Sequence, residues 1–589
     1  MQRETRGAAA NGTPNGGRSS ALELALQAYA ARTRALKGWR RAAAALVAGA
    51  FSVLAMPPFF LWPILLFTLP VLVWLIDGAA DPSVDGEEQN NHEQAPAAMT
   101  WRRLFHVGLV GWCFAYAFHV TGLYWLREAF LVTGGGLALL WPLGVLGLPA
   151  YLAIYHGLAA AFAARFGARG LSRVIALAVG LGVGEWLRGH LFTGFPWNVL
   201  GEALTYPLVL MQSAAVFGIY GLTVVTVLVL AAPGVVLAGN PRGREDVLFP
   251  RANPSARAAS ILLFPLALMV VYGTVRLRAT PPAFVEGVKI RLVQPSIDQR
   301  EKWQAAKQPE FIARHLELSL RGPTNVPDNL AGITHVVWPE AAMPFLPMQR
   351  PEVLRTLGDA LPDGIFLLAG VLRLERGSSP PDASGRSVDA NDKIYNSLAV
   401  FDGDGRPIAV YDKSHLVPFG EYLPFQSFLE GIGLSSLTRQ RGGFAIGPEP
   451  RPLLAVPGLP RAGPLICYEV VFPGIAARSA GRPDVMINVT NDGWFGNSTG
   501  PRQHLHQARL RSVEEGIPLI RVANNGISAA YDAYGRELAR IDLDVAGVVD
   551  TGLPGRLDPT VYARMGDLVF ALMSAGLLAL LSRRRDPAK

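Results

Sequence analysis

The sequence predicts a polytopic α-helical membrane bundle of about eight spans, joined to an external α/β domain. Half of the 589 residues are hydrophobic and 17% are charged, whereas soluble proteins carry about 25% charged residues. The apolar residues form long runs before residue 277 and again after residue 567. The stretch between these runs has the composition of a soluble domain, so the chain contains more than one domain.

Along the chain, residues 1–40 are rich in Ala, Gly, Ser and Arg and predict a basic disordered arm. The bundle is predicted over 41–277, and each span is close to the roughly 20 apolar residues that cross a bilayer. Its seven spans are expected over 42–58, 60–77, 104–126, 137–163, 171–190, 208–238 and 257–276. The sixth is long enough to tilt or to break near Pro233. An eighth, shorter span is predicted over 566–583, followed by a cytoplasmic tail at 584–589.

Basic residues predict the orientation of these spans, because Lys and Arg concentrate on the cytoplasmic side. They cluster before the first span, after the fourth, after the sixth and after the last, at Lys37, Arg40, Arg41, Arg165, Arg169, Arg173, Arg242, Arg244, Arg251 and Arg583 to Arg585. With eight spans all four clusters lie on one side. Both termini are therefore expected in the cytoplasm and the domain over 283–555 outside it. This placement also explains the net charge of +8 without a nucleic-acid partner.

The external domain contains eight short runs rich in β-forming residues, at 288–294, 334–339, 365–373, 396–402, 408–413, 463–468, 485–490 and 518–523. Helical patterns at 300–320 and 502–516 separate some of them. Apolar strands mixed with amphipathic helices predict an α/β domain whose sheets are covered.

Three of the predicted strands end at residues that carry chemistry. Cys467 ends one strand, Glu340 follows another after a proline, and Lys413 ends a third. Taken singly, each has an ordinary interpretation: a small core residue, a solvated strand end and a surface lysine paired with Asp412. Together they supply a thiol nucleophile, a carboxylate that takes its proton and a cation that stabilises an oxyanion. Cys113 lies inside an apolar run, so a disulfide with Cys467 is not expected.

Other candidate residues are weaker. His504 and His506 lie on a predicted helix and point to different sides, so they predict structural roles and no metal pair. No phosphate-binding motif is present, and no cofactor is expected. Glu185 lies within the fifth span and is a functional candidate, with an ion pair to Arg188 as the alternative. The aromatic segment 192–197 is either an interfacial belt or a lipid-facing lip beneath the external domain.

At Glu340, Lys413 and Cys467 the chain resembles the nitrilase, or carbon–nitrogen hydrolase, superfamily, whose signature is Glu, Lys and Cys in that order. It resembles more specifically the apolipoprotein N-acyltransferase family, over about residues 40–582. The motifs that carry this resemblance are EWLRGHLFTGFPW (185–197), VQPSIDQREKW (293–303), WPEAAMPF (338–345), YDKSHLVPFGEYLPF (411–425), ICYEVVFP (466–473) and NDGWFGNSTGPRQHLHQAR (491–509).

The resemblance implies a four-layered αββα sandwich and a role for each residue. Glu340 would be the general base, Lys413 the oxyanion-stabilising cation and Cys467 the nucleophile. It also implies a second carboxylate beside the lysine, two residues that shape the site next to the cysteine, and one at the substrate entry: Glu421, Tyr468, Glu469 and Trp303.

The implied reaction takes place at the inner membrane of a bacterium. An acyl chain passes from a phospholipid, phosphatidylethanolamine in particular, to the N-terminal amine of a diacylglyceryl-cysteine on a lipoprotein. Water must be excluded from the thioester, and the apolar stretch 422–434 is either a lid or ordinary packing.

Two other functions compete with this one. A membrane-tethered amidase of the nitrilase type would use the same three residues but needs no eight-span bundle. A transporter would need paired charges and broken helices, and carboxylates are nearly absent from the predicted spans.

Overall fold

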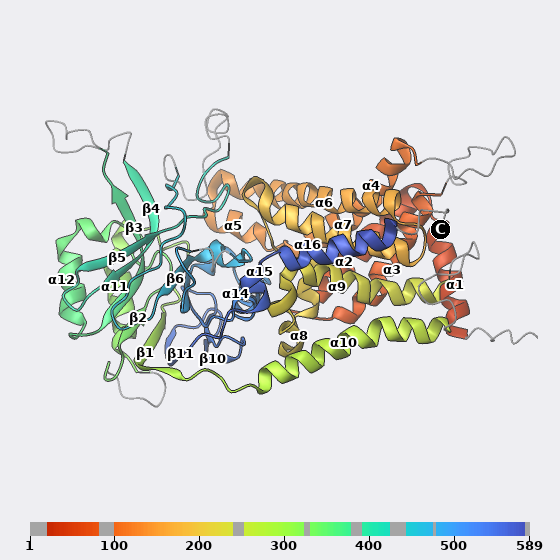
Figure 1. Ribbon diagram of the computed structural model, residues 1–589. Coiled ribbons are helices and arrows are strands. Elements are labelled where there is room, and N and C mark those ends of the chain that lie inside the picture. Colours follow the sequence, from red (N-terminus) through yellow and green to blue (C-terminus); the bar gives the residue numbers. More distant parts are fainter. Residues whose placement is uncertain are drawn as a thin grey trace, which may run out of the picture.

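The computed structural model describes residues 21–81, 99–239, 253–322, 330–377, 392–424, 443–474 and 479–582. A helical bundle and an α/β domain lie end to end along the long axis of the molecule (Figure 1). The first helix, α1 (Ala21–Arg34), and the end of the last, α16 (Leu568–Ser582), lie at the end of the bundle away from the α/β domain.

Six helical segments of the described chain are long and apolar enough to cross a membrane, at 62–79, 101–122, 138–166, 171–193, 214–237 and 254–278. They contain α3 (Leu65–Ala79), α4 (Trp101–Gly122), α6 (Trp141–Phe166), α7 (Leu171–His190), α9 (Ala214–Leu237) and α10 (Pro254–Arg278). The predicted first and eighth spans correspond to α2 (Gly38–Ser52) and α16, which have 15 residues each. These two helices therefore fall short of the length expected of a full span.

The structure corrects two predictions about the bundle. Part of the expected disordered arm is the helix α1, because its sequence is rich in Ala, Leu and Arg and Tyr29 packs edge-on against Trp74; residues 1–20 lie outside the described residues. The predicted sixth span divides into α8 (Leu208–Met211) and α9, with non-helical backbone at Gly218 and none at Pro233. Gly218 has a φ of 61°, and a Cβ there would lie 2.3 Å from the Tyr562 ring.

Two carboxylates of the bundle are buried, one near the end of α3 and one in the connection between α7 and α9. Asp77 on α3 is buried and accepts a hydrogen bond of 3.1 Å from Arg173 on α7. Glu202 is buried and accepts one of 3.2 Å from Gln507 of the α/β domain. These carboxylates have nearby partners, as buried charges require.

The α/β domain contains two sheets. The first has the order β11-β1-β2-β3-β4-β5 and the second β10-β9-β8-β7-β6. Their strands are β1 (Phe284–Gln294), β2 (His335–Val337), β3 (Phe366–Glu375), β4 (Lys393–Phe401), β5 (Pro407–Asp412), β6 (Ala462–Ile466), β7 (Val485–Thr490), β8 (Leu519–Ala523), β9 (Ser528–Tyr531), β10 (Glu537–Ile541) and β11 (Gly547–Pro554). All eight predicted strands are present; β9, β10 and β11 were missed.

The two sheets pack face to face and are covered by helices, so the expected αββα sandwich is confirmed. Alternate residues of β3 serve the two faces: Leu368 packs between the sheets, whereas Leu367 and Ala369 pack against the helix layer. That layer is formed by α11 (Gln308–Leu320) and by α12 (Pro351–Ala360), which was not predicted.

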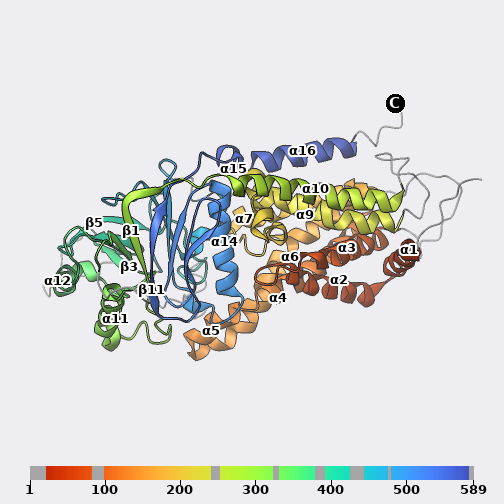
Figure 2. The ribbon, with the colours of Figure 1, turned by 90° about the horizontal axis from the view of Figure 1, so that it is seen from below.

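The opposite helix layer is α14 (Gly500–Glu515), which lies between the second sheet and the bundle (Figure 2). The helix ends at Gly516, whose left-handed conformation is a common helix terminator. The apolar cluster around α14 includes Trp125 and Trp197 from the membrane half. The α/β domain therefore packs against the bundle through this layer.

Candidate active site

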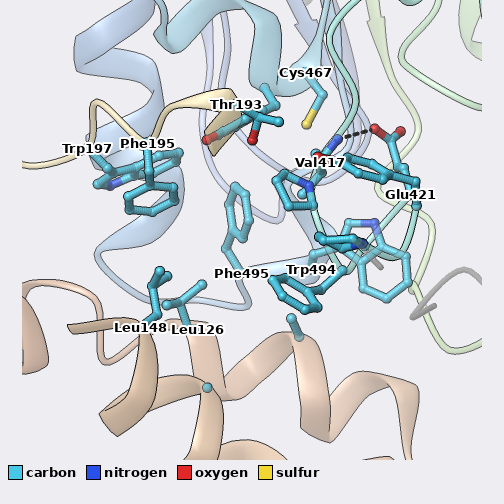
Figure 3. Close-up of a pocket in the computed structure, with 18 of the residues that line it drawn as sticks. Leu126, Leu148, Thr193, Phe195, Trp197, Val417, Glu421, Cys467, Trp494 and Phe495 are labelled. Atoms are coloured by element: carbon cyan, nitrogen blue, oxygen red, sulfur yellow. Dashed lines mark hydrogen bonds between the residues drawn. The ribbon is translucent and has the colours of Figure 1, made fainter. Parts of the chain in front are cut away.

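Cys467 lies at the carboxyl end of β6, at the start of a short 3₁₀ turn (Cys467–Val471). Its φ of 50° is left-handed, a conformation that costs a non-glycine residue about 1–3 kcal/mol. Two contacts hold the turn: Glu469 Oε2 accepts from the backbone N–H of Ile466 at 2.7 Å, and His504 Nε2 lies 3.2 Å from the Cys467 carbonyl oxygen. The thiol points toward a cavity (Figure 3).

Glu340, Lys413 and Cys467 all line this cavity, although they come from different strands of both sheets. Lys413 Nζ lies 3.7 Å from Glu340 Oε1 and donates to Glu421 at 3.0 Å. Asn396 on β4 donates to both carboxylates, at 2.8 Å to Glu340 and 2.9 Å to Glu421. The three predicted residues and the predicted second carboxylate thus form one buried group.

Burial sets the protonation of this group. It raises the pKa of the Cys467 thiol, and the Glu340 carboxylate raises it further, while the Lys413 ammonium opposes both. Burial also raises the pKa of Glu340, again against Lys413. The pKa of Lys413 is raised because Glu421 and Glu340 outweigh its own burial. The thiol is therefore protonated at rest, beside a carboxylate able to accept its proton, and the lysine is a permanent cation.

Glu469 does not line the cavity, and it lies in the turn that carries Cys467. Its Oε1 accepts from the Tyr411 hydroxyl at 2.7 Å, from the backbone N–H of Ser414 at 3.0 Å and from that of His415 at 3.1 Å. The Arg451 charge lowers the pKa of Glu469 against the effect of burial, helped by the hydrogen bonds from Ile466 and Tyr411. One buried carboxylate therefore joins the segment that carries Lys413 to the turn that carries Cys467.

Sequence reasoning missed four residues that support the site. Lys302 is buried and donates to the backbone carbonyl of Glu340 at 3.0 Å, and burial lowers its pKa to about 8. It precedes Trp303 in the QREKW string, but nothing in the string distinguishes it from a surface lysine. Asn396 lies within an unremarkable strand, so its contacts had no sequence signal.

The other two form a network with His504. Asp492 lies 2.9 Å from His504 Nδ1 and accepts from Arg521 at 2.8 Å. The Arg521 charge and His504 hold the pKa of Asp492 at about 2 despite its burial. This arrangement agrees with the predicted structural role of His504. The described residues contain no group of His, Cys, Asp or Glu suited to a metal ion.

The cavity has a volume of about 930 Å³ and lies between the two halves of the protein. The membrane half contributes α5 (Leu126–Thr133), α6 and the segment 191–197, and the α/β domain contributes Trp303, Tyr468 and residues 417–424. Leu126, Leu148 and Phe495 line its lower part (Figure 3). Of the predicted lid, only 422–424 are described; residues 425–434 lie outside the described residues.

The segment 192–197 belongs to this cavity and not only to an interfacial belt. Arg188 on α7 is buried, binds Glu185 through its guanidinium, and donates to the carbonyl oxygens of Phe195 at 2.6 Å and Trp197 at 2.8 Å. The Tyr468 hydroxyl donates to the Gly194 carbonyl at 2.8 Å. The pair predicted as the alternative for Glu185 exists, and it fixes a wall of the cavity.

Both halves of the chain match families of known proteins. Residues 48–232 match the apolipoprotein N-acyltransferase N-terminal domain, and residues 289–559 match the carbon-nitrogen hydrolase family. The apolipoprotein N-acyltransferase of Rhodopseudomonas palustris is 42% identical over 93% of this chain and 96% of its own length. Those of Bradyrhizobium diazoefficiens and Brucella melitensis are 43% and 40% identical, each over 94% of this chain and over 96% and 99% of their own lengths. The similarity covers both halves of the molecule.

Proposed function

Because this chain belongs to the apolipoprotein N-acyltransferase family, we propose that it transfers an acyl chain from a phospholipid to its lipoprotein acceptor through a thioester on Cys467. The family membership makes it a membrane acyltransferase of lipoprotein maturation. The donor, the covalent intermediate and the role of each site residue are our proposals.

In the first step Glu340 takes the thiol proton of Cys467, and the thiolate attacks an ester carbonyl of the phospholipid. The negative charge that develops on the carbonyl oxygen is stabilised by the Lys413 ammonium. The intermediate breaks its bond to the glycerol oxygen, which receives the proton from Glu340. A lysophospholipid leaves, and the acyl chain stays on the sulfur.

In the second step the neutral N-terminal amine of the acceptor attacks the thioester carbonyl. Glu340 takes a proton from the amine, and the bond between carbon and sulfur breaks. The Cys467 thiolate then recovers that proton from Glu340, so the enzyme returns to its starting state and the product is an amide. Glu421 and Asn396 hold the lysine and the base in place through both steps. Tyr468 and Trp303 line the walls, and Glu469 holds the turn that carries Cys467.

One observation favours this reaction over hydrolysis of a small amide. The buried carboxylate, ammonium and thiol of Glu340, Lys413 and Cys467 open into an apolar cavity that membrane helices help to form. A small-molecule amidase has no use for a wall made of α5 and α6. An acyl chain needs such a wall, because it must leave the bilayer without entering water.

The intermediate can be tested by mass. Purified protein is incubated with phosphatidylethanolamine alone, and its intact mass is measured with and without neutral hydroxylamine, which cleaves thioesters. We expect one acyl chain on Cys467, removed by hydroxylamine and also by a diacylated lipopeptide, which gains that chain. Normal turnover with both substrates but no adduct on Cys467 would show direct transfer instead.

A further inference from the structure

A second cavity, of about 350 Å³, lies beside the first between α5 and loops of the α/β domain. Its lining is mainly polar. The lining of the first cavity, which we propose holds the acyl chain and which is called the acyl cavity below, is mainly apolar. Glu128 of α5 lies on one side, and Asp298, Gln299, Gly493, Asn525 and Asp544 of the α/β domain lie on the other.

A single segment of chain separates the two cavities. Trp494 and Phe495 line the acyl cavity, whereas Gly493 and Gly496 line the polar one. A Cβ on Gly493 would lie 3.0 Å from Asn525 Oδ1, and a Cβ on Gly496 would lie 3.2 Å from the Glu128 side chain. The two glycines therefore keep the polar cavity open directly behind the wall of the active site.

Two residues that line this cavity each have a buried polar side-chain atom with no partner among the described residues. Gln299 is 4% exposed; its Oε1 accepts from Asn491 at 2.7 Å, and its Nε2 donates to nothing. Asn525 Oδ1 is also buried without a donor. A buried amide without partners costs free energy. One unused donor and one unused acceptor match the C=O and N–H of a peptide group.

The charge of the residues that line the polar cavity favours the polypeptide of the acceptor over the phosphate headgroup of the donor. Glu128, Asp298 and Asp544 outnumber the single cation Arg300. Glu128 pairs with the neighbouring Arg127 at 2.8 Å, and Asp298 also accepts from the backbone N–H of Arg300 at 2.8 Å. The remaining excess of negative charge repels a phosphate and attracts the N–H groups and basic side chains of a polypeptide.

We propose that this polar cavity binds the polypeptide of the acceptor, namely the first residues that follow its acylated amino terminus. The proposal rests on the function proposed above, since it gives the lipid part of the acceptor to the apolar cavity and its peptide part to the polar one. The two cavities lie on either side of one chain segment, residues 493–496, so the proposal has the acceptor pass around this segment with its lipid part on one side and its peptide part on the other.

The test uses two diacylated lipopeptides that differ only in carrying two Lys or two Glu after the lipidated cysteine. We compare the unaltered protein with Glu128→Gln/Asp544→Asn; asparagine tolerates the left-handed φ of 62° at position 544. The control, Glu317→Gln/Asp404→Asn, removes two exposed charges elsewhere on the same domain. We expect the unaltered protein and the control to prefer the Lys peptide in KM by about fivefold, and the double variant to lose this preference.

Acylation of Cys467 by phosphatidylethanolamine vesicles is measured in the same proteins and should be unchanged. If the double variant slows that step instead, the cavity holds the donor headgroup and the proposal is wrong. Equal KM values for the two peptides in the unaltered protein would also overturn it. Binding of both peptides to Cys467→Ala repeats the comparison without chemistry, so it tests the cavity even if the thioester mechanism fails.

Discussion

The ionisable side chains of the site depend on one another for their charge. Glu340 is buried beside Lys413, and Asn396 donates to both Glu340 and Glu421. Without the lysine, burial alone would favour the neutral carboxylic acid, which cannot accept the thiol proton. The buried site therefore works as a unit, and single substitutions in it should be more damaging than the loss of one contact.

Replacing Cys467 by alanine should abolish transfer while the protein still folds, because no other cysteine lies in the α/β domain. Activity is measured by the mass gained by a diacylated lipopeptide. Cys113→Ala is the matched control and should retain full activity, since Cys113 is buried within α4. Transfer by the Cys467→Ala protein would remove this residue from the mechanism.

Glu340→Gln and Lys413→Ala should each slow acylation of Cys467 by at least about a hundredfold, the effect expected of a general base or an oxyanion donor. The rate of adduct formation from phospholipid alone measures this step. Glu375→Gln and Lys393→Ala, which alter exposed residues on β3 and β4, should leave the rate unchanged. A near-normal rate in either active-site variant would assign that residue a structural role only.

At the scale of single elements, the helix α7 is held by two buried ion pairs. The helix α7 has a buried arginine near each end: Arg173 binds Asp77, and Arg188 binds Glu185 together with the loop that bounds the cavity. Only the second pair reaches the site. The same type of ion pair therefore stabilises the bundle at one end of the helix and positions a cavity wall at the other.

Arg188→Met should slow acylation of Cys467 by about tenfold or more, because charge-assisted hydrogen bonds to the carbonyls of Phe195 and Trp197 are lost. Arg173→Met removes the same type of ion pair, so it should lower thermal stability as much as Arg188→Met does. It should leave the rate per folded molecule unchanged. Rates are normalised to the folded fraction from size-exclusion chromatography. Equal effects of the two variants on that rate would show that Arg188 only stabilises the bundle.

The loop after β7 holds a second charged network, in which Asp492 has a pKa of about 2 instead of its ordinary 3.8. A lowered folded-state pKa stabilises the protein above pH 3.8, by about 2 kcal/mol, and this contribution is lost as pH falls from 3.8 toward 2. Asp492→Asn should therefore lower Tm most at pH 6, with a smaller difference at pH 3. A Tm difference independent of pH would contradict this account.

At the scale of the whole molecule, the acyl cavity exists only because the α/β domain rests on the bundle. Its walls come from α5, α6 and the 191–197 segment on one side and from the sandwich on the other. Arg173 lies in the first turn of α7, and Arg169, which binds Asp81, precedes that helix; both lie at the end of α7 remote from the site. We propose that this end faces the cytoplasm and the α/β domain the periplasm.

Reporter fusions test this orientation. A reporter at the C-terminus should be active in the cytoplasm, and one inserted near residue 380 should be active outside it, because Arg169 and Arg173 lie at the end of the bundle away from the sandwich. A fusion truncated before α16 reports on the short last helix. Identical signals at the two sites would mean that α16 does not cross the membrane.

The sequence by itself predicted six spans that the structure contains, eight of the strands and the four charged or nucleophilic residues that line the cavity. These features are local: an apolar run, an alternation of residues or a short motif around Cys467 is readable within about twenty positions. The errors were also local, since β9 and β10 have four and five residues and β11 contains two glycines and a proline. The helix α1 replaced part of an expected disordered arm.

Only the tertiary structure decided which distant residues meet. Lys302 binds the backbone of Glu340, Arg188 binds the loop that Tyr468 also contacts, and Gln299 faces a polar cavity beside an apolar one. Whether a lysine is a surface residue or a buried cation depends on what packs over it, and a sequence pattern does not contain that information. The residues proposed as nucleophile and base are readable from local motifs of the chain, but the cavity into which they open is a product of packing between two domains.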